Sequence, residues 1–372
     1  MRILVAPASF KGTLTAGEAA DAIAAGVRRA RPDAEVVLRP VADGGEGTLD
    51  VLGLPTRTVR VHDAWGMSRL VRLGEDGPGL VIELARICGF DPARREVMSA
   101  STRGVGEALR AGLDMTCGRY LVALGGSATC DGGTGMLRAL GAGFWDADGN
   151  VLPEGGAALE HLARFQPPRI PVVAIDVACD VDAPLLGPSG AARRFAPQKG
   201  ATAEDVERLE RGLTRWADVL EDLTGARLHD VPGGGAAGGT GAALALLGGR
   251  LRPGAELILD RVGFDALLAG VDLVVTGEGR VDAGSLQGKA PAVVARRAAR
   301  RGVPVALVAG AIEVEVPGVT AAWALPAGDP AEGAAAALTA RVAAGLAAWI
   351  SDRARGASAR GERQRALSVS AR

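Results

Sequence analysis

Length, composition and charge narrow the classes of protein to which this sequence can belong. The chain has 372 residues, 48% of them hydrophobic and 23% charged, a balance typical of a soluble globular protein. This length is too great for a typical single core and fits two domains. The formal net charge of -1 provides no basic field, so we expect neither a nucleic-acid nor a membrane partner.

The cysteines and the opening residues of the chain are what we expect of a cytoplasmic protein. Its 4 cysteines show no C-x-x-C spacing, which argues against a disulfide framework or a zinc site. The opening MRILVAPASFKG predicts a strand rather than a signal peptide. No stretch approaches the roughly 18 apolar residues that a membrane helix needs. Residues 351–372 lack apolar periodicity and are rich in Arg and Ser, which predicts a mobile, solvated tail.

The first 56 residues predict a strand, a helix and a second strand. Residues 3–6 form a short apolar run, and Thr15 with Glu18 makes a capping box at which a helix begins. Pro32 ends this helix, and residues 36–38 form the next strand. This order implies a parallel sheet with a right-handed crossover.

The pattern changes after residue 56. Residues 57–61, 70–73 and 80–84 are strand-like runs joined only by turns. Strands without intervening helices must be antiparallel, so a second sheet begins here. Helical segments then alternate with runs at 121–124 and 172–177, which makes this sheet mixed.

Strand–helix alternation returns from residue 272, with strands at 273–275, 305–308 and 322–325 and a last helix ending near 350. We therefore predict an α/β fold of two domains. Residues 1–56 and 270–350 form a Rossmann-like, doubly wound parallel sheet, and residues 57–269 form an inserted α/β domain that carries the mixed sheet.

Polar residues gather in glycine-flanked loops, mostly just after strands, where ligands bind in open α/β sheets. The loops are ASFKGT (8–13), VADGGEGT (41–48), GGSATCDGGTG (125–135), ACDVDAPLLG (178–187), FAPQKGA (195–201) and TGEGRVDAGSLQGK (276–289). They contain carboxylates, hydroxyls and lysines but no histidine, which argues against histidine-based catalysis and a histidine metal site.

Carboxylates, cations and glycine backbone together are what phosphoryl transfer requires. Mg²⁺ prefers oxygen ligands, phosphates need cationic and N–H donors, and an Asp can accept the hydroxyl proton. Asp and Gly also form ordinary turns, and for any single loop this explanation is about as good as a catalytic role. Six such loops together favour the catalytic interpretation.

Two further patterns resemble nucleotide-binding motifs but fail in detail. GSLQGK (284–289) has one residue too few between its glycines for a Walker A loop, and Ala290 replaces the Ser or Thr that binds magnesium. Gly233, Gly235 and Gly238 spell G-x-G-x-x-G, with Glu256 downstream, but no predicted strand precedes them. A nicotinamide-dependent dehydrogenase is thus disfavoured, although a helix N-terminus that binds phosphate is still open here.

The loops, in this order, resemble the type I glycerate kinase family. The segments that match its pattern are SFKGTLTA, VADGGEGT, GGSAT-x-DGG, CDVD-x-PLLG, PQKGA, GAAGGTGA and TGEGRVD-x-x-S-x-x-GK. The resemblance implies ATP-dependent phosphorylation of D-glycerate, usually at the 2-hydroxyl, and an active site in a cleft between two α/β domains. The chemistry of phosphoryl transfer adds Mg²⁺ as the expected cofactor. Departures from the family pattern are Ala8 for Asp, Cys130 and Ala183 for Asn, and Ala196 for Gly.

The candidate site residues come from these loops. The predicted catalytic residues are Asp43, Lys11, Asp180 and Asp282, and the candidate magnesium ligands are Asp131, Asp180 and Glu278. The residues predicted to bind substrate or phosphate are Ser9, Gly44, Gly45, Ser127, Thr129, Asp182, Gln198, Lys199, Arg280, Ser285 and Lys289.

Individual roles follow from position and charge. We favour Asp43 as the base and Asp180 as a metal or substrate ligand, although the two roles can be exchanged. Asp182 lies two residues from Asp180, so in an extended segment both would face one side. Lys11 is expected to contact a phosphate or the glycerate carboxylate, and Arg280 can hold that carboxylate with two hydrogen bonds.

Three readings are left open by the sequence. The first is a glycerate kinase, for which 2-phosphoglycerate is the favoured product and 3-phosphoglycerate is left open. The second is a kinase for a related short hydroxy acid. The third is a non-catalytic metabolite-binding regulator, which the retained acidic positions disfavour. The partners are then ATP and D-glycerate, and a homodimer is left open.

Overall fold

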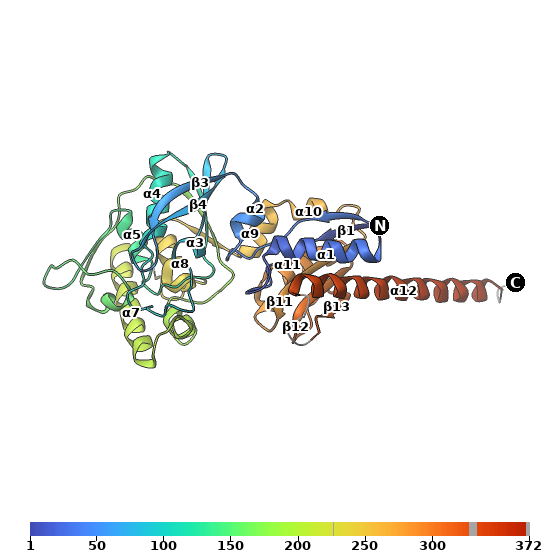
Figure 1. Ribbon diagram of the computed structural model, residues 1–372. Coiled ribbons are helices and arrows are strands. Elements are labelled where there is room, and N and C mark those ends of the chain that lie inside the picture. The colour runs from blue at the N-terminus through green and yellow to red at the C-terminus, as the bar shows by residue number, and fades with distance from the viewer. Residues whose placement is uncertain (226, 327–332, 370–372) are drawn as a thin grey trace. The chain divides into compact units, whose positions relative to one another are not determined.

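The computed structural model describes residues 1–225, 227–326 and 333–369 (Figure 1). The chain divides into two compact units. Unit 1 comprises Met1–Val41 and Val262–Arg372, and unit 2 comprises Ala42–Arg261. The chain passes from unit 1 to unit 2 after Val41 and back after Arg261, in both cases earlier than the domain limits of 56 and 269 expected from the sequence.

Specific contacts account for the observed boundaries. The helix that follows the DGGEG loop is tied to unit 2, because the Glu83 carboxylate accepts the N–H groups of Gly47 and Leu49. Residues 262–269 belong to unit 1, since Arg2 donates to the Ala269 carbonyl at 3.1 Å. Hydrogen bonds of this kind, between distant segments, cannot be predicted from apolar runs in the sequence.

Unit 1 is built on one parallel sheet with strand order β13-β12-β11-β1-β2. Its strands are β1 (Arg2–Val5), β2 (Glu35–Leu38), β11 (Leu273–Val281), β12 (Val305–Ile312) and β13 (Ala321–Ala324). Its helices are α1 (Ala16–Ala30), α10 (Phe264–Leu267), η3 (Ser285–Gln287, a 3₁₀ turn), α11 (Ala290–Arg300) and α12 (Ala334–Val369). The predicted parallel sheet is confirmed.

Helices α1 and α12 lie side by side against the sheet of unit 1 (Figure 1). Ile23 of α1 and Leu338 of α12 meet strand residues such as Val275 in one core cluster. The predicted capping box is present: the Thr15 hydroxyl accepts the Glu18 N–H, and the Glu18 carboxylate accepts the Thr15 N–H. Helix α11 packs against β11 and β12.

The last helix is more apolar than the sequence reading allowed. Its segment Ala334–Arg353 is long and apolar enough to cross a membrane by length and composition, with a mean hydropathy of 1.4. However, Leu338, Val342 and Leu346 are buried in the core of unit 1, and core helices of globular proteins pass the same test. Helix α12 continues through residues 351–369, and residues 370–372 lie outside the described part. The mobility of this tail stays a prediction.

Unit 2 carries a mixed sheet with strand order β10-β9-β6-β5-β4-β3 and a separate β7–β8 pair. The strands are β3 (Thr56–His62), β4 (Ser68–Asp76), β5 (Gly79–Glu83), β6 (Arg119–Ala123), β7 (Gly143–Trp145), β8 (Arg164–Gln166), β9 (Ala174–Ala178) and β10 (Arg250–Arg252). As predicted, β3, β4 and β5 pair antiparallel. Strands β5, β6, β9 and β10 pair parallel, which completes the mixed sheet.

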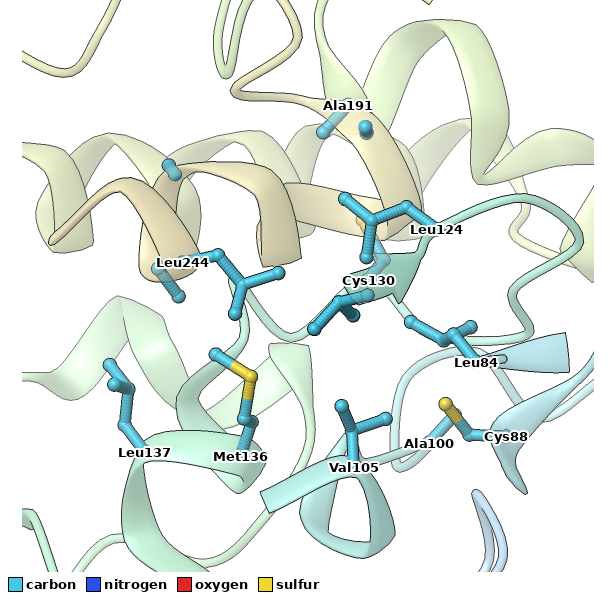
Figure 2. Packing of buried hydrophobic residues seen from close by; sticks show 14 of the residues in the cluster. Leu84, Cys88, Ala100, Val105, Leu124, Cys130, Met136, Leu137, Ala191 and Leu244 are labelled. Carbon is cyan, nitrogen blue, oxygen red and sulfur yellow. The ribbon is translucent and has the colours of Figure 1, made fainter. Parts of the chain in front are cut away.

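The helices of unit 2 surround this sheet. They are α2 (Thr48–Leu52), α3 (Ala85–Cys88), α4 (Arg103–Asp114), α5 (Thr134–Ala139), η1 (Gly156–His161), α6 (Ala191–Phe195), η2 (Pro197–Lys199), α7 (Ala203–Thr224), α8 (Ala236–Leu246) and α9 (Gly254–Arg261). Figure 2 shows side chains of its large core, among them Leu84, Val105, Leu124 and Leu244.

The core of unit 2 is connected directly to one of the predicted site loops. Trp216 of α7 is fully buried and packs edge-on against Phe165, with ring centroids 4.8 Å apart. Its indole N–H donates to the Gly132 carbonyl at 3.1 Å. The GGSATCDGG segment is therefore held by the packed interior and not only by its own turns.

Candidate active site

Three of the predicted loops converge at one edge of the sheet in unit 2. The loops after β6 and β9 leave from the carboxyl ends of parallel strands, where ligands bind in open α/β sheets. The DGGEG loop lies across both: Gly125 N donates to Gly44 O at 3.0 Å. Gly44 also packs against Ala178, the last residue of β9, so closely that a β-carbon would come within 2.8 Å.

The backbone carbonyl of Asp43 and the carboxylate of Asp180 both lie beside Gly254, the first residue of α9. A β-carbon at Gly254 would come within 2.1 Å of Asp43 O and 3.0 Å of Asp180 Oδ1. Each carboxylate accepts one backbone N–H through Oδ1, from Gly45 at 3.0 Å for Asp43 and from Ala255 at 3.1 Å for Asp180. The two favoured aspartates are thus close together, and both also order local backbone.

Asp182 has a different environment from Asp180. Its side chain is 90% exposed, with Arg194 at 3.8 Å, whereas Asp180 is partly buried beside α9. Asp180 and Asp182 therefore do not share one environment, as an extended segment would have given them. Strand β9 ends at Ala178, and residues 179–184 have no regular secondary structure.

Asp131 is fully buried and its carboxylate is surrounded by donors. Oδ2 accepts the N–H and the hydroxyl of Thr102, each at 2.8 Å, and the N–H of Gly135 at 3.1 Å. Oδ1 accepts the N–H of Gly133 at 3.1 Å. Burial raises the pKa of Asp131, while these four hydrogen bonds favour its ionised form. This arrangement fits a carboxylate that shapes the GGSATCDGG turn better than one that binds magnesium.

Replacing Asp131 with Asn should destabilise the protein. The amide would direct N–H donors at the donors of Thr102 or Gly135, and the expected loss is about 1–3 kcal/mol of unfolding free energy. Thermal unfolding should show a lower Tm, by roughly 2–4 °C per kcal/mol. An unchanged Tm combined with a higher Mg²⁺ requirement would make Asp131 a metal ligand instead.

Lys199 joins the PQKGA segment to the GGSAT loop. It is only 4% exposed, and its Nζ donates to Ser127 Oγ at 2.8 Å and to the Thr129 carbonyl at 2.7 Å. Burial lowers the pKa of Lys199. The structure therefore brings the predicted residues Ser127, Thr129 and Lys199 together, whereas Gln198 is exposed on the same turn.

The remaining predicted site residues lie in unit 1, along β1 and β11. Residues 6–8 run beside β11, with Ala8 N donating to Gly277 O at 2.8 Å. The chain then passes Gly279 of β11, where a β-carbon would lie 3.4 Å from Lys11 N. Lys11 is exposed and Ser9 is half-buried at this carboxyl edge.

Strand β11 extends further than the sequence predicts and carries Glu278 and Arg280 within it. The expected strand ends at Val275, but pairing with β12 continues to Val281. Lys289 lies beyond this strand, with its Nζ 3.8 Å from Glu278, 3.6 Å from Asp282 and 3.3 Å from Ser285 Oγ. The Lys289 ammonium holds the pKa of Asp282 below its usual value. Four predicted residues therefore form one cluster.

Arg280 pairs with Glu313, the residue that follows β12, rather than with Glu278 or Asp282. If this exposed guanidinium nonetheless binds the substrate carboxylate, Arg280→Lys should raise the KM for glycerate more than the KM for ATP, because an ammonium cannot form the two parallel hydrogen bonds. Steady-state kinetics with each substrate varied in turn would measure this. Equal changes in both KM values would assign Arg280 to the structural pair with Glu313.

Magnesium fits only part of the predicted ligand set. Within residues 1–225, 227–326 and 333–369, no three His, Cys, Asp or Glu side chains lie close enough to share a metal ion. Asp131 is enclosed by donors, and Glu278 has the Lys289 ammonium beside it. Asp180 lies close to Asp43. One or two carboxylates are sufficient where substrate phosphates and water complete the magnesium shell.

Comparison with known proteins agrees with this arrangement of motifs. Residues 3–347 match the model of the glycerate kinase family. The chain is 40% identical over 323 residues to a glycerate kinase of Bacillus subtilis (strain 168), covering 83% of this chain and 85% of the relative. It is 39% identical over 329 residues to a glycerate 2-kinase of Escherichia coli (strain K12), with coverage of 83% and 85%.

A solved structure agrees as well. It is the crystal structure of a protein assigned as glycerate kinase 2 from Salmonella typhimurium LT2, which matches with a TM-score of 0.81 and 38% identity over 95% of this chain and 99% of that one. The chain belongs to the glycerate kinase family. It is accordingly a phosphotransferase, as the sequence predicts.

Two departures from the glycerate kinase pattern lie at packed positions. Cys130 stands in place of Asn, and its side chain lies in the core of unit 2, in the region of Leu84 and Leu124 (Figure 2). Burial raises the pKa of this thiol to about 12. Ala183 is also buried, and its carbonyl accepts the Gly235 N–H at 3.0 Å.

Sequence reasoning missed two residues that order the glycerate kinase loops. Thr102 supplies two of the donors to Asp131, and Glu83 binds the backbone after the DGGEG loop. Glu83 did carry a signal, since a lone carboxylate inside the apolar run 80–84 must be buried with partners. The described residues directly before the G-x-G-x-x-G segment form turns and not a strand. This agrees with the rejection of a nicotinamide-dependent dehydrogenase.

Proposed function

We propose that this chain is a type I glycerate kinase that transfers the γ-phosphoryl group of ATP to the 2-hydroxyl of D-glycerate, giving 2-phosphoglycerate and ADP. The observation that supports the proposal is the placement of Asp43 and Asp180 beside Gly254, at the edge where three glycine-rich loops converge. Phosphoryl transfer needs little covalent chemistry from the protein and depends on positioning and charge, which such an edge can supply.

Asp43 is the proposed general base. The N–H of Gly45 fixes the orientation of its carboxylate, and the glycines that follow allow substrate to approach the backbone. An aspartate placed within hydrogen-bond reach of the 2-hydroxyl would accept its proton as the phosphoryl group is transferred. Asp180 can exchange this role with Asp43, since both residues lie beside Gly254.

Asp180 is the proposed magnesium ligand, with Asp43 available as the second carboxylate. Bound Mg²⁺ would neutralise charge on the phosphates of ATP. The backbone N–H of Ala255 holds one Asp180 oxygen in place, which sets the direction of the carboxylate.

Cations for the phosphates and the substrate carboxylate come from lysine and arginine. Of the 42 Lys and Arg residues, 3 are lysines, namely Lys11, Lys199 and Lys289, and all of them lie in predicted site loops. Arginine and lysine differ in shape and hydration, so a chain that otherwise uses arginine keeps lysine where a compact ammonium is needed. We propose that Lys11 contacts a phosphate or the glycerate carboxylate.

We also propose a cytoplasmic location, which the free state of Cys88, Cys117, Cys130 and Cys179 supports.

An ADP-release assay with a set of acceptors tests the substrate. Purified protein with Mg-ATP would be given D-glycerate, L-glycerate and glycolate in separate reactions. The proposal predicts the highest kcat/KM with D-glycerate. A higher value with glycolate or L-glycerate would make the protein a kinase for a related hydroxy acid. No ADP release with any acceptor, but a measurable Kd for one of them, would make it a metabolite-binding regulator.

A further inference from the structure

A buried carboxylate outside the predicted site binds the segment that follows the Asp43 loop. Glu83 ends β5 and is 1% exposed. Its Oε1 accepts the N–H of Gly47 at 2.9 Å, and its Oε2 accepts the N–H of Leu49 at 2.8 Å. The Nε of Arg86 lies 3.2 Å from the same Oε2. A buried charge is costly unless it is paired and hydrogen-bonded, and Glu83 has both kinds of partner.

The hydrogen bonds continue from this segment to Asp43. Thr48 is fully buried, and its hydroxyl donates to Gly45 O at 2.7 Å. The N–H of Gly45 in turn donates to Asp43 Oδ1 at 3.0 Å. Because α2 begins at Thr48 without a side-chain cap from its own N-cap residue, Glu83 supplies the acceptors that this helix start lacks.

We propose that Glu83 is a positioning residue for the phosphoryl transfer. It holds the start of α2, and through Thr48 and Gly45 it sets the place of the Asp43 carboxylate. The proposal rests on the proposed function in one respect, namely that Asp43 acts in catalysis. Glu83 itself does not touch substrate in this scheme.

The first test is Glu83→Gln, which keeps the side-chain shape but directs an amide at a backbone donor. We expect kcat to fall about 10–100-fold, since small misplacements of a reacting group have effects of this size. The KM values should change by less than about threefold, as expected when only transition-state stabilisation is lost. Glu75→Gln is the matched control: this carboxylate lies on β4 in the same sheet, pairs with exposed Arg57, and should leave kcat unchanged.

A double-mutant cycle separates positioning from a general loss of stability. If Glu83 acts through Asp43, the variant with both Glu83→Gln and Asp43→Asn should turn over no more slowly than Asp43→Asn alone. Fold losses in kcat that multiply would show that Glu83 acts independently of Asp43 and would overturn the proposal. A Glu83→Gln variant with wild-type kcat would overturn it as well.

Hydrogen exchange provides a readout that needs no substrate. The peptide spanning residues 42–50 should exchange faster in Glu83→Gln than in the wild type, while the Glu75→Gln control should not differ. Unchanged exchange in Glu83→Gln would contradict the positioning role, whether or not the wild type is active. A wild type that is inactive on D-glycerate would count against the proposed function alone. If Glu83→Gln does not fold, Thr48→Val replaces it, because it removes only the hydroxyl bond to Gly45 O and leaves the longer Thr48 N–H bond to the same oxygen, at 3.3 Å. Wild-type kcat and exchange in Thr48→Val would then overturn the proposal.

Discussion

Replacing Asp43 with Asn is expected to lower kcat by about 10²–10⁴-fold, the usual contribution of a general base. The substitution is nearly isosteric, and the amide oxygen can still accept the N–H of Gly45, so the local turn should persist. What is lost is the negative charge that accepts the hydroxyl proton. Steady-state kinetics with D-glycerate, together with an unchanged Tm, would establish the effect.

Asp146→Asn is the matched control for this variant. Asp146 also uses Oδ1 to accept backbone N–H groups in a turn, from Asp148 at 3.0 Å and Asn150 at 2.8 Å, but it follows β7, away from the predicted loops in the sequence. Its kcat should equal that of the wild type. If Asp43→Asn also retained most of its turnover, Asp43 would be a turn residue only, and Asp180→Asn would become the next variant to examine.

Lys11→Met should reduce turnover by on the order of a hundredfold or more, because a cation that stabilises the charge developing on the phosphate contributes a few kcal/mol to the transition state. Lys11 is exposed at the carboxyl edge of unit 1, so its removal should not lower the Tm. Lys11→Arg keeps the charge but changes the shape, and we expect only partial recovery of kcat.

Binding offers a second measure of Lys11. With only three lysines in the chain, labelling by an amine-reactive reagent can be followed residue by residue with mass spectrometry. Mg-ATP or D-glycerate should protect Lys11 from labelling. Near-normal turnover in Lys11→Met, together with unprotected labelling, would remove Lys11 from the site.

Periodicity and capping were sufficient to predict most of the fold. The capping box at Thr15 and Glu18 forms as predicted, and the absence of helices between residues 57 and 84 correctly indicated antiparallel strands. The extension of β11 could not be read in the same way. Its second half, TGEGRV, is polar and contains glycines, and only its pairing with the apolar β12 makes it a strand.

The chemistry of the site was less accessible from the sequence than its location. Asp43 and Asp131 occupy similar DGG motifs, yet Asp131 is enclosed by four donors and Asp43 is only half-buried. The difference arises from Thr102, which is distant in sequence. Likewise, nothing local to Arg280 indicates that its partner is Glu313. Roles of this kind depend on contacts between segments that no single motif contains.

Phosphorus NMR of the reaction mixture tests the proposed reaction most directly. Purified protein, Mg-ATP and D-glycerate should yield ADP and a single phosphomonoester whose phosphorus couples to one carbon-bound proton, as in 2-phosphoglycerate. A phosphorus signal coupled to two equivalent or nearly equivalent protons would place the phosphate on the 3-hydroxyl. ADP accompanied only by inorganic phosphate, or no turnover of ATP, would contradict the assignment of this chain as a D-glycerate kinase.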